Sequence, residues 1–196
     1  MIKNNILQLP EFEKDTYYVL FLESETSLPV RFITHTWIVT VYNGQTDRWD
    51  ILHKKNLSKD SWQHLHKNFI PAFQGLPKYY FGNKKHWPAK IIGIVKGKKN
   101  SKAHKLCLQI QDAQKSYPFI DKYKFVPGPN CNSFTQWFLD KNNIKSFRIS
   151  KTSLGREFWE LQRFKENAHK KILNYWIKEQ KETTSQKNKS VFGKQK

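Results

Sequence analysis

The sequence predicts an α+β fold in which strands come first and a helix that carries a cysteine follows. Two β-rich runs separated by Asn43-Gly44 indicate a hairpin, and apolar residues at helical spacing around 103–113 and 131–138 indicate helices. The third observation is a strongly basic C-terminal end. With 196 residues, of which 38% are hydrophobic, the chain can bury a sizeable core as a single domain of about 160 residues.

Four segments are expected along the chain. Residues 1–15 are polar and should be a peripheral N-terminus, 16–160 form the main domain, 161–180 form a C-terminal amphipathic helix, and 181–196 form a basic flexible tail. The opening residues lack the apolar stretch of a signal peptide, and two cysteines do not suit a secreted disulfide scaffold. We therefore expect a cytoplasmic protein. No window approaches the roughly 18 apolar residues of a transmembrane helix, so membrane contact would be peripheral.

Runs of β-branched and aromatic residues predict the strands. A first strand covers 17–22, a second covers 30–42, a third covers 48–53 after the tight Asn43-Gly44 turn, and another covers 89–95. Between Leu57 and Pro88 the pattern is irregular and rich in aromatic residues.

For this irregular stretch we expect a short helix near Ser61 to Phe69 and then a packed loop. His64 and His66 fall within it, but two histidines without a cysteine or carboxylate pattern indicate solvated side chains rather than a metal site. We expect no metal and no cofactor.

A helix is predicted where apolar residues share one face, at Ala103, Leu106, Cys107, Ile110 and Ala113. Cys107 lies in the middle of that face, which is typical of an inert core thiol. Pro118 then ends the helix and leads into a loop.

The second cysteine lies where a Pro/Gly turn becomes a helix. Pro127-Gly128-Pro129 prevents an earlier start, Asn130 is a natural cap, and Cys131 falls in the first turn. Unpaired backbone N–H groups and the positive end of the helix dipole favour a thiolate at such a position, and the same groups could stabilise an oxyanion. A buried structural thiol is the alternative interpretation.

The best-placed base is His35, near the start of the second strand. It shares one face with Trp37, Val39 and Val41 by the two-residue period of a strand. From there it could reach a neighbouring helix terminus, as a Cys–His pair requires. A hydrogen-bonded structural histidine is the alternative.

Thiol enzymes usually carry a third polar group that orients the histidine. The next strand offers two candidates, His53 on the face of Trp49 and Ile51, and Asp50 on the other face. Exposed polar residues at a strand end would explain both equally well.

Four sequence blocks carry a resemblance to a known family. They are His35-Thr36-Trp37-Ile38, Tyr80-Phe81-Gly82, Ser116-Tyr117-Pro118-Phe119 and Pro127-Gly128-Pro129-Asn130-Cys131-Asn132-Ser133-Phe134. In this order they resemble the uncharacterised bacterial family catalogued as domain of unknown function 3750, over about residues 17 to 158. Serine is common in that family where this chain has Cys131, so either the nucleophile varies or the position is not a nucleophile.

A looser similarity reaches the circularly permuted, papain-like NlpC superfamily, which includes the lecithin:retinol acyltransferase branch. In that superfamily a histidine opening a strand precedes an Asn-Cys at a helix start, and His35 and Asn130-Cys131 match this order. The resemblance implies a papain-like α+β fold with a small antiparallel sheet and packed helices.

The residues and the resemblances together predict a thiol hydrolase or acyltransferase acting on an amide, ester or thioester. Cys131 would attack the carbonyl, His35 would be the base with His53 as the second candidate, and Asn130, Asn132 and Ser133 would shape the site or the oxyanion pocket. Its substrate would be an acyl-containing small molecule, lipid or peptide. The alternative is a binding protein without chemistry.

Charge suggests the partners of that alternative. The chain has a net charge of +19, and from Arg163 to Lys196 there are ten Lys or Arg residues against three Glu. A basic amphipathic helix with aromatic residues can lie on an anionic membrane. Nucleic acid is the other natural partner, but the sequence shows no zinc-finger spacing, RNA-recognition motif or P-loop, so it is the less favoured one.

Overall fold

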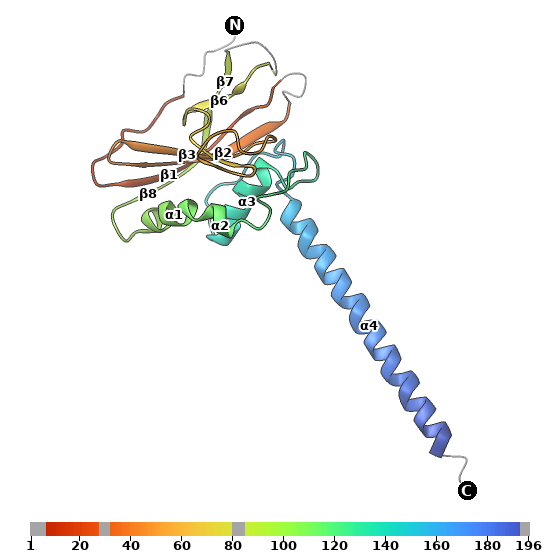
Figure 1. The fold of residues 1–196 in the computed structure, drawn as a ribbon. Coiled ribbons are helices and arrows are strands. Elements are labelled where there is room, and N and C mark those ends of the chain that lie inside the picture. The colour runs from red at the N-terminus through yellow and green to blue at the C-terminus, as the bar shows by residue number, and fades with distance from the viewer. Residues whose placement is uncertain (1–6, 28–31, 80–84, 193–196) are drawn as a thin grey trace. The chain divides into compact units, whose positions relative to one another are not determined.

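The computed structural model describes residues 7–27, 32–79 and 85–192, and the chain divides into two compact units (Figure 1). The first unit ends at Phe158 and the second begins at Trp159. The candidate active-site residues all belong to the first unit.

The first unit is a mixed α+β domain with an antiparallel sheet. Its strands are β1 (Tyr17–Glu25), β2 (Thr34–Tyr42), β3 (Gln45–Ile51), β4 (Ser61–Trp62), β5 (Leu65–Lys67), β6 (Gln74–Pro77), β7 (His86–Pro88) and β8 (Lys90–Gly97). Its helices are α1 (Lys102–Gln111), α2 (Ala113–Ser116) and α3 (Cys131–Lys141). The predicted α+β class is confirmed.

Among the described residues, six strands form the main sheet in the order β4-β5-β3-β2-β1-β8, and every neighbouring pair is antiparallel. The turn at Asn43-Gly44 joins β2 to β3 with Tyr42 opposite Gln45, as the sequence predicts, and both turn residues have positive φ. Strands β6 and β7 pair separately.

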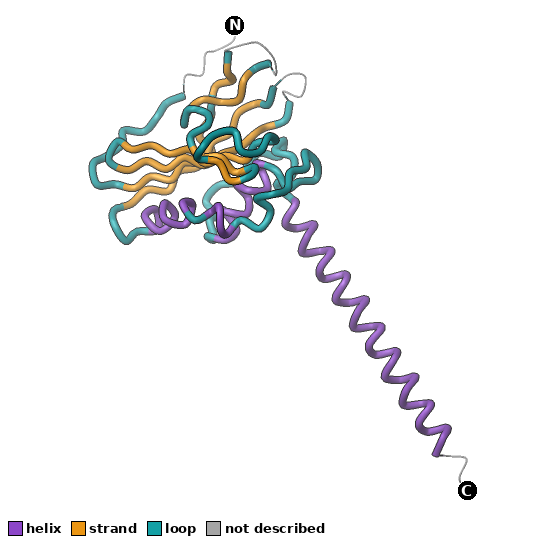
Figure 2. The backbone as a smooth tube through the Cα atoms, viewed as in Figure 1, coloured by secondary structure: helices purple, strands orange, loops and turns teal. Residues whose placement is uncertain are grey.

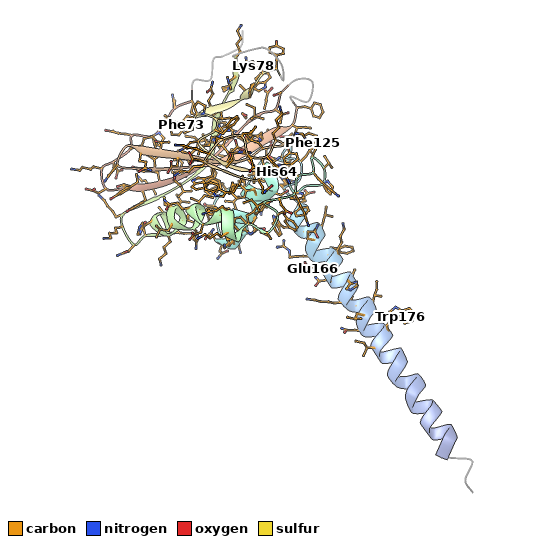
Figure 3. The ribbon with its side chains drawn as sticks, in the orientation of Figure 1. His64, Phe73, Lys78, Phe125, Glu166 and Trp176 are labelled. Carbon is orange, nitrogen blue, oxygen red and sulfur yellow. The ribbon has the colours of Figure 1, made fainter. Side chains whose placement is uncertain are left out.

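The two faces of the sheet are covered differently. Figure 2 shows α1, α2 and α3 together on one side of the strands, and Figure 1 shows β6 and β7 on the other side. On the helix side, Phe21 packs against Phe138. On the opposite side, Leu20 and Trp37 belong to a buried cluster against which Phe73 packs (Figure 3).

The predicted helix near Ser61 to Phe69 is wrong, because this stretch forms β4 and β5. Gln63 and Asn68 both have a φ of 56°, which a right-handed helix does not contain. Leu65 pairs with Ile51 and Trp62 pairs with Leu65, so long-range pairing extends the sheet. Of the apolar and aromatic residues in this hairpin, Leu65 is buried, Trp62 is half-buried and Phe69 is exposed.

Two other strand boundaries differ from the sequence prediction. The third strand ends at Ile51, so His53 lies beyond it, and the second begins at Thr34. The predicted start at residue 30 lies outside the described residues, as do residues 1–6 of the expected peripheral N-terminus and the Tyr80-Phe81-Gly82 block. Within that N-terminus, Phe12 makes an edge contact with Tyr18.

The helix α4 runs from Phe158 to Phe192, and all of it after Phe158 belongs to the second unit. Residues 181–192 are therefore helical where the sequence predicted a flexible tail. Lys, Gln and Glu are good helix formers, and the segment has no Gly or Pro before Gly193. Residues 193–196 lie outside the described part. Within the described residues, no helix has an apolar stretch long enough to span a membrane.

Candidate active site

The start of α3 is capped on both sides of Cys131. The Asn130 side chain accepts hydrogen bonds from the backbone N–H groups of Asn132 (2.9 Å) and Ser133 (3.1 Å), and the Ser133 hydroxyl accepts one from the Asn130 N–H. Asn130 in turn donates to the carbonyls of Phe125 and Leu154. The cap is therefore tied to loops on both sides of the helix, which holds Cys131 in place.

This cap decides which N–H groups remain for an oxyanion. Those of Asn132 and Ser133 are already donated to Asn130, whereas no described residue accepts from the N–H of Cys131. Of the three residues expected to shape the site, Asn130 therefore acts as the cap, and the free donor belongs to Cys131 itself.

Asn132 joins the helix start to the strand that carries His35. Its side chain donates to the Thr34 carbonyl at 3.0 Å and to the Leu154 carbonyl at 2.9 Å. Its oxygen accepts from the Thr36 hydroxyl at 3.0 Å. Both chain neighbours of His35 are thus bonded to the side chain that follows Cys131, so the strand and the helix cannot shift independently here.

His35 forms a buried ion pair with Asp50. Its Nε2 lies 2.9 Å from Asp50 Oδ1, although the two groups are not aligned as a linear hydrogen bond. Burial works against a charged imidazole, but the Asp50 carboxylate and the Cys131 sulfur outweigh it and raise the pKa of His35 to about 10. His35 is therefore protonated at neutral pH.

Arg48 completes the buried chain of charges. Its Nη2 and Nε lie 2.6 and 3.1 Å from Asp50 Oδ2, and its Nη1 donates to the carbonyls of Pro71 and Gln74. The guanidinium also lies 4.1 Å from the centre of the Trp37 ring. Burial alone would raise the pKa of Asp50, but His35 and Arg48 lower it, so the carboxylate stays ionised.

The thiol of Cys131 is close to the same histidine. It acts on the pKa of His35 both as a nearby charge and as a side-chain hydrogen-bond partner. In this structure the thiol donates to the side-chain oxygen of Asn132, with Sγ 3.6 Å from Oδ1. The structure thus brings together Cys131, His35 and Asp50, two of which belong to strands far from the cysteine in sequence.

His53 lies outside this group. It is exposed, follows β3, and makes an edge contact with Tyr123 at a ring distance of 5.4 Å. The turn at Asn43-Gly44 contains the signal that separates the two candidates. A two-residue turn puts Ile38 opposite Trp49, so in the same register Asp50 is opposite Trp37. Trp37 and His35 share one face of β2, so the Asp50 side chain lies on the same face of the sheet as His35.

Sequence reasoning missed Arg48 altogether. Strand alternation places it on the same face as Asp50, and it is fully buried, whereas a lone arginine in a strand normally indicates a solvent-facing position. The signal that could have identified Arg48 is its spacing from Asp50, because two residues apart on a strand the two opposite charges share one face and can form an ion pair.

The site is closed to solvent in this structure. Cys131 is 6% exposed and His35 is 4% exposed. Tyr123 is half-buried, and burial, followed by the charges of Cys131 and Asp50, raises the pKa of its hydroxyl. Tyr123 also contacts the His64 ring.

The remaining candidate groups have structural partners. Cys107 is buried and its sulfur lies 3.9 Å from the Tyr18 carbonyl, and burial raises the pKa of Cys107 to about 12. His64 and His66 bond to the carbonyls of Leu52 and Lys54 rather than standing in solvent as the sequence suggested. Among the described residues, no group of three or more His, Cys, Asp or Glu could hold a metal ion.

Comparison with known proteins gives one match. The family described as "Protein of unknown function (DUF3750)" matches residues 19–158. No curated protein and no solved structure matches the chain. The matched range begins within β1 and covers the rest of the sheet, α1 to α3 and every residue of the candidate site, and the chain belongs to the DUF3750 family.

Proposed function

We propose that this protein is a thiol hydrolase or acyltransferase that acts on an amide, ester or thioester. The observation that carries the proposal is the buried group Cys131, His35, Asp50 and Arg48, in which Asp50 pairs with both His35 and Arg48 and the Cys131 sulfur helps to raise the pKa of His35. A cysteine that serves only as core packing needs no protonated histidine beside it, and an ion pair that serves only stability needs no thiol.

These residues can carry out the first half of the reaction, in which Cys131 becomes acylated. A protonated His35 is the partner that a thiolate at Cys131 requires, and the thiolate attacks the carbonyl carbon of the substrate. The resulting oxyanion meets the free N–H of Cys131. Collapse of this intermediate breaks the bond to the leaving group, which takes the proton of His35.

The second half of the reaction uses the neutral His35 left behind. It accepts a proton from water, giving hydrolysis, or from an acceptor alcohol or amine, giving transfer. The nucleophile attacks the thioester carbon, Cys131 leaves as a thiolate, and His35 is protonated again. Asp50 orients the ring through Nε2, and Arg48 keeps Asp50 ionised.

The order of these residues supports a papain-like, NlpC-type arrangement as the finer description of the fold. A histidine at the start of a strand precedes a cysteine at a helix start, and an orienting carboxylate lies on the adjacent strand. This assignment is part of the proposal, and a solved structure with the same strand order would test it.

Substrate must displace a side chain to reach the thiol. Tyr123 is the candidate, because it is only half-buried and lies near Cys131 and Asp50. Phe125 and Val126 in the same loop are exposed, at 45% and 57%. The loop therefore presents apolar side chains where a substrate would arrive.

The test is the rate of iodoacetamide labelling of the two cysteines in the native protein across pH 5 to 10. We expect Cys131 to react at neutral pH and Cys107 only slowly, because burial raises the pKa of Cys107 to about 12. His35→Ala should lower the labelling rate of Cys131 while circular dichroism shows the domain folded. If Cys131 reacts no faster than Cys107, the proposal fails.

A second candidate function is supported by α4. Its exposed apolar side chains include Phe164, Ile172 and Trp176, and Figure 3 shows Trp176 projecting from the helix. Arg163 and several lysines lie along the same segment. This combination suits peripheral binding to an anionic membrane, which would bring a catalytic or a non-catalytic domain to that surface.

A further inference from the structure

Four large apolar side chains are exposed at the end of the first unit where β2 begins. Phe32, in the connection between β1 and β2, is 70% exposed, and Tyr79, after β6, is 46% exposed. Phe125 and Val126, in the loop before α3, are exposed as well. Three separate segments therefore present apolar side chains to solvent, and these four residues are called the loop-tip surface.

Hydrogen bonds fasten the connection between β1 and β2 to the hairpin of β6 and β7. The Ser27 hydroxyl donates to the Pro77 carbonyl at 2.7 Å. The indole N–H of Trp87 donates to the Thr26 carbonyl at 2.8 Å. The segments that carry Phe32 and Tyr79 are therefore neighbours, although they are far apart in sequence.

The loop that carries Phe125 is linked to the start of β2 through one carbonyl. Asn132 donates to the carbonyls of Thr34 and Leu154 at 3.0 and 2.9 Å. Asn130 donates to the carbonyls of Leu154 and Phe125 at 3.0 and 2.8 Å. All three segments of the loop-tip surface thus border the same end of the sheet.

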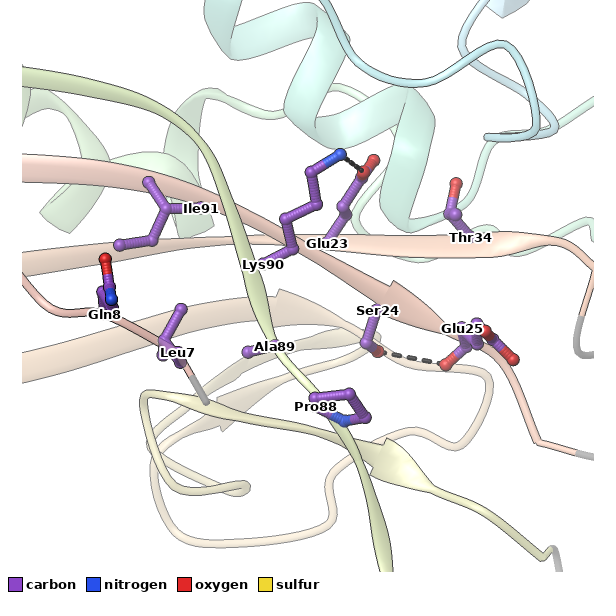
Figure 4. Close-up of a pocket in the computed structure, with 10 residues that line it drawn as sticks. All are labelled: Leu7, Gln8, Glu23, Ser24, Glu25, Thr34, Pro88, Ala89, Lys90 and Ile91. Carbon is purple, nitrogen blue, oxygen red and sulfur yellow. Dashed lines mark hydrogen bonds and ion pairs between the residues drawn. The ribbon is translucent and has the colours of Figure 1, made fainter. Parts of the chain in front are cut away.

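This end is hollowed rather than flat. Figure 4 shows Ser24, Glu25 and Thr34 beside the connection between β1 and β2, where they line a pocket of about 770 Å³ together with Pro88 of β7. A stable protein–protein interface needs a closely packed, complementary face. Apolar side chains on separate loops beside a hollow are better suited to a surface that adapts to them, such as the headgroup layer of a lipid bilayer.

Lysines accompany the apolar residues. Lys78 immediately precedes Tyr79, and Lys124 immediately precedes Phe125. The same loops also carry Lys85, Lys122 and Lys151, against the acidic residues Glu25 and Asp121. Aromatic rings settle at the headgroup level of a bilayer, and a lysine beside them can reach lipid phosphates, which attract its charge. The loop-tip surface therefore combines hydrocarbon with an excess of positive charge.

We infer that this end of the first unit docks on an anionic lipid bilayer, with the loop-tip surface among the headgroups and the neighbouring lysines on phosphates. The surface belongs to the first unit, so it is a membrane contact additional to the one proposed for α4. His35 follows Phe32 by three residues, so docking here brings the end of the sheet that carries the candidate active site to the bilayer. The inference does not depend on the thiol chemistry of Cys131.

Hydrogen–deuterium exchange of the full chain locates the contact. Vesicles of phosphatidylcholine with phosphatidylglycerol should slow exchange at 32–34, 77–79 and 122–126 and leave α1 unchanged, whereas phosphatidylcholine alone should have little effect. Protection confined to α4 overturns the inference and leaves the membrane role of α4 intact. If wild-type protein does not associate with anionic vesicles at low salt, both membrane contacts fail and the proposed thiol chemistry is untouched.

Substitution of the apolar tips tests their contribution. Phe32→Ser combined with Tyr79→Ser should lower the partition coefficient onto anionic vesicles about tenfold. The matched control is Ile94→Ser combined with Leu108→Ser, which changes comparably exposed residues on β8 and α1 and should leave partitioning unchanged. Circular dichroism checks that both proteins are folded. If the first pair of substitutions leaves binding at the wild-type level, the inference is wrong and a protein partner becomes the occupant to seek.

Charge reversal separates this surface from the general basicity of the chain. Lys85→Glu combined with Lys124→Glu should weaken binding to anionic vesicles about tenfold. Lys98→Glu combined with Lys105→Glu changes the net charge equally near the start of α1, which packs on the opposite end of β1, and should weaken binding much less. Equal losses for the two pairs would show that net charge alone governs binding, which overturns the inference.

Discussion

Aromatic side chains have opposite surroundings in the two units of this chain. In the first unit, Trp37 and Phe134 are completely buried, whereas in α4 Phe164 is 72% exposed and Trp176 is 57% exposed. Packing therefore holds the first unit together, while α4 depends on local helix propensity. The contrast shows that aromatic residues stabilise the two units in different ways, and the first and last predictions below test it directly.

The largest expected effect is on core packing. Phe134→Ala should lower the free energy of unfolding by about 3–5 kcal/mol, because it leaves a cavity next to Tyr117 and Trp137. Phe164→Ala on α4 removes the same atoms from an exposed position and should change that free energy by less than about 0.5 kcal/mol. Urea unfolding followed by circular dichroism measures both changes. Equal losses would show that Phe164 is packed as well as Phe134, which contradicts the contrast between the units.

Removing the central charge of the candidate site should cost about as much as the core substitution. Asp50→Asn leaves the Arg48 guanidinium buried without its anion and removes the charge that keeps His35 protonated, so we expect a loss of about 3–5 kcal/mol in unfolding free energy. Glu13→Gln breaks an exposed pair with Lys96 and should have little effect. A small loss for Asp50→Asn would show that the ion pairs of Asp50 contribute little to the free energy of unfolding.

The contribution of protonated His35 to stability should be measurable from the pH dependence of the free energy of unfolding. Its pKa rises from 6.5 to about 10 on folding, so the folded state binds one more proton than the unfolded state between those values. The stabilisation is complete below about pH 6.5 and is lost as pH rises towards 10, by up to about 1.4 kcal/mol per pH unit. Urea unfolding at several pH values should show this decline in wild type and a flatter curve in His35→Gln, and identical slopes would contradict a raised pKa.

Local patterns predicted the elements that local interactions determine. The Asn43-Gly44 turn, the apolar face around Leu106 and the cap at Asn130 each need only neighbouring residues, and all three occur in the structure. The stretch from Ser61 to Phe69 misled because its partners on β3 lie more than ten residues away. Its local pattern is irregular, and pairing with Ile51 makes it a strand.

The candidate site was predictable in part for a similar reason. Cys131 and His35 follow from local context and strand phase. Asp50 rather than His53 follows only when the hairpin register is counted back from the turn. The burial of Arg48 depends on the carbonyls of Pro71 and Gln74, which no local pattern connects to it.

The smallest expected effect on stability belongs to the end of α4. Deleting residues 181–196 should leave the melting temperature nearly unchanged, because this segment lacks an apolar stripe and adds little to any core. The same deletion should weaken association with vesicles that contain anionic lipid, since its lysines attract a negative surface over a Debye length of about 10 Å at 0.1 M salt. Co-sedimentation at increasing salt measures this, and neutral vesicles are the control. If full-length and truncated chains bind equally, the charges that matter belong to the first unit, and the contrast between the two units would then concern packing alone.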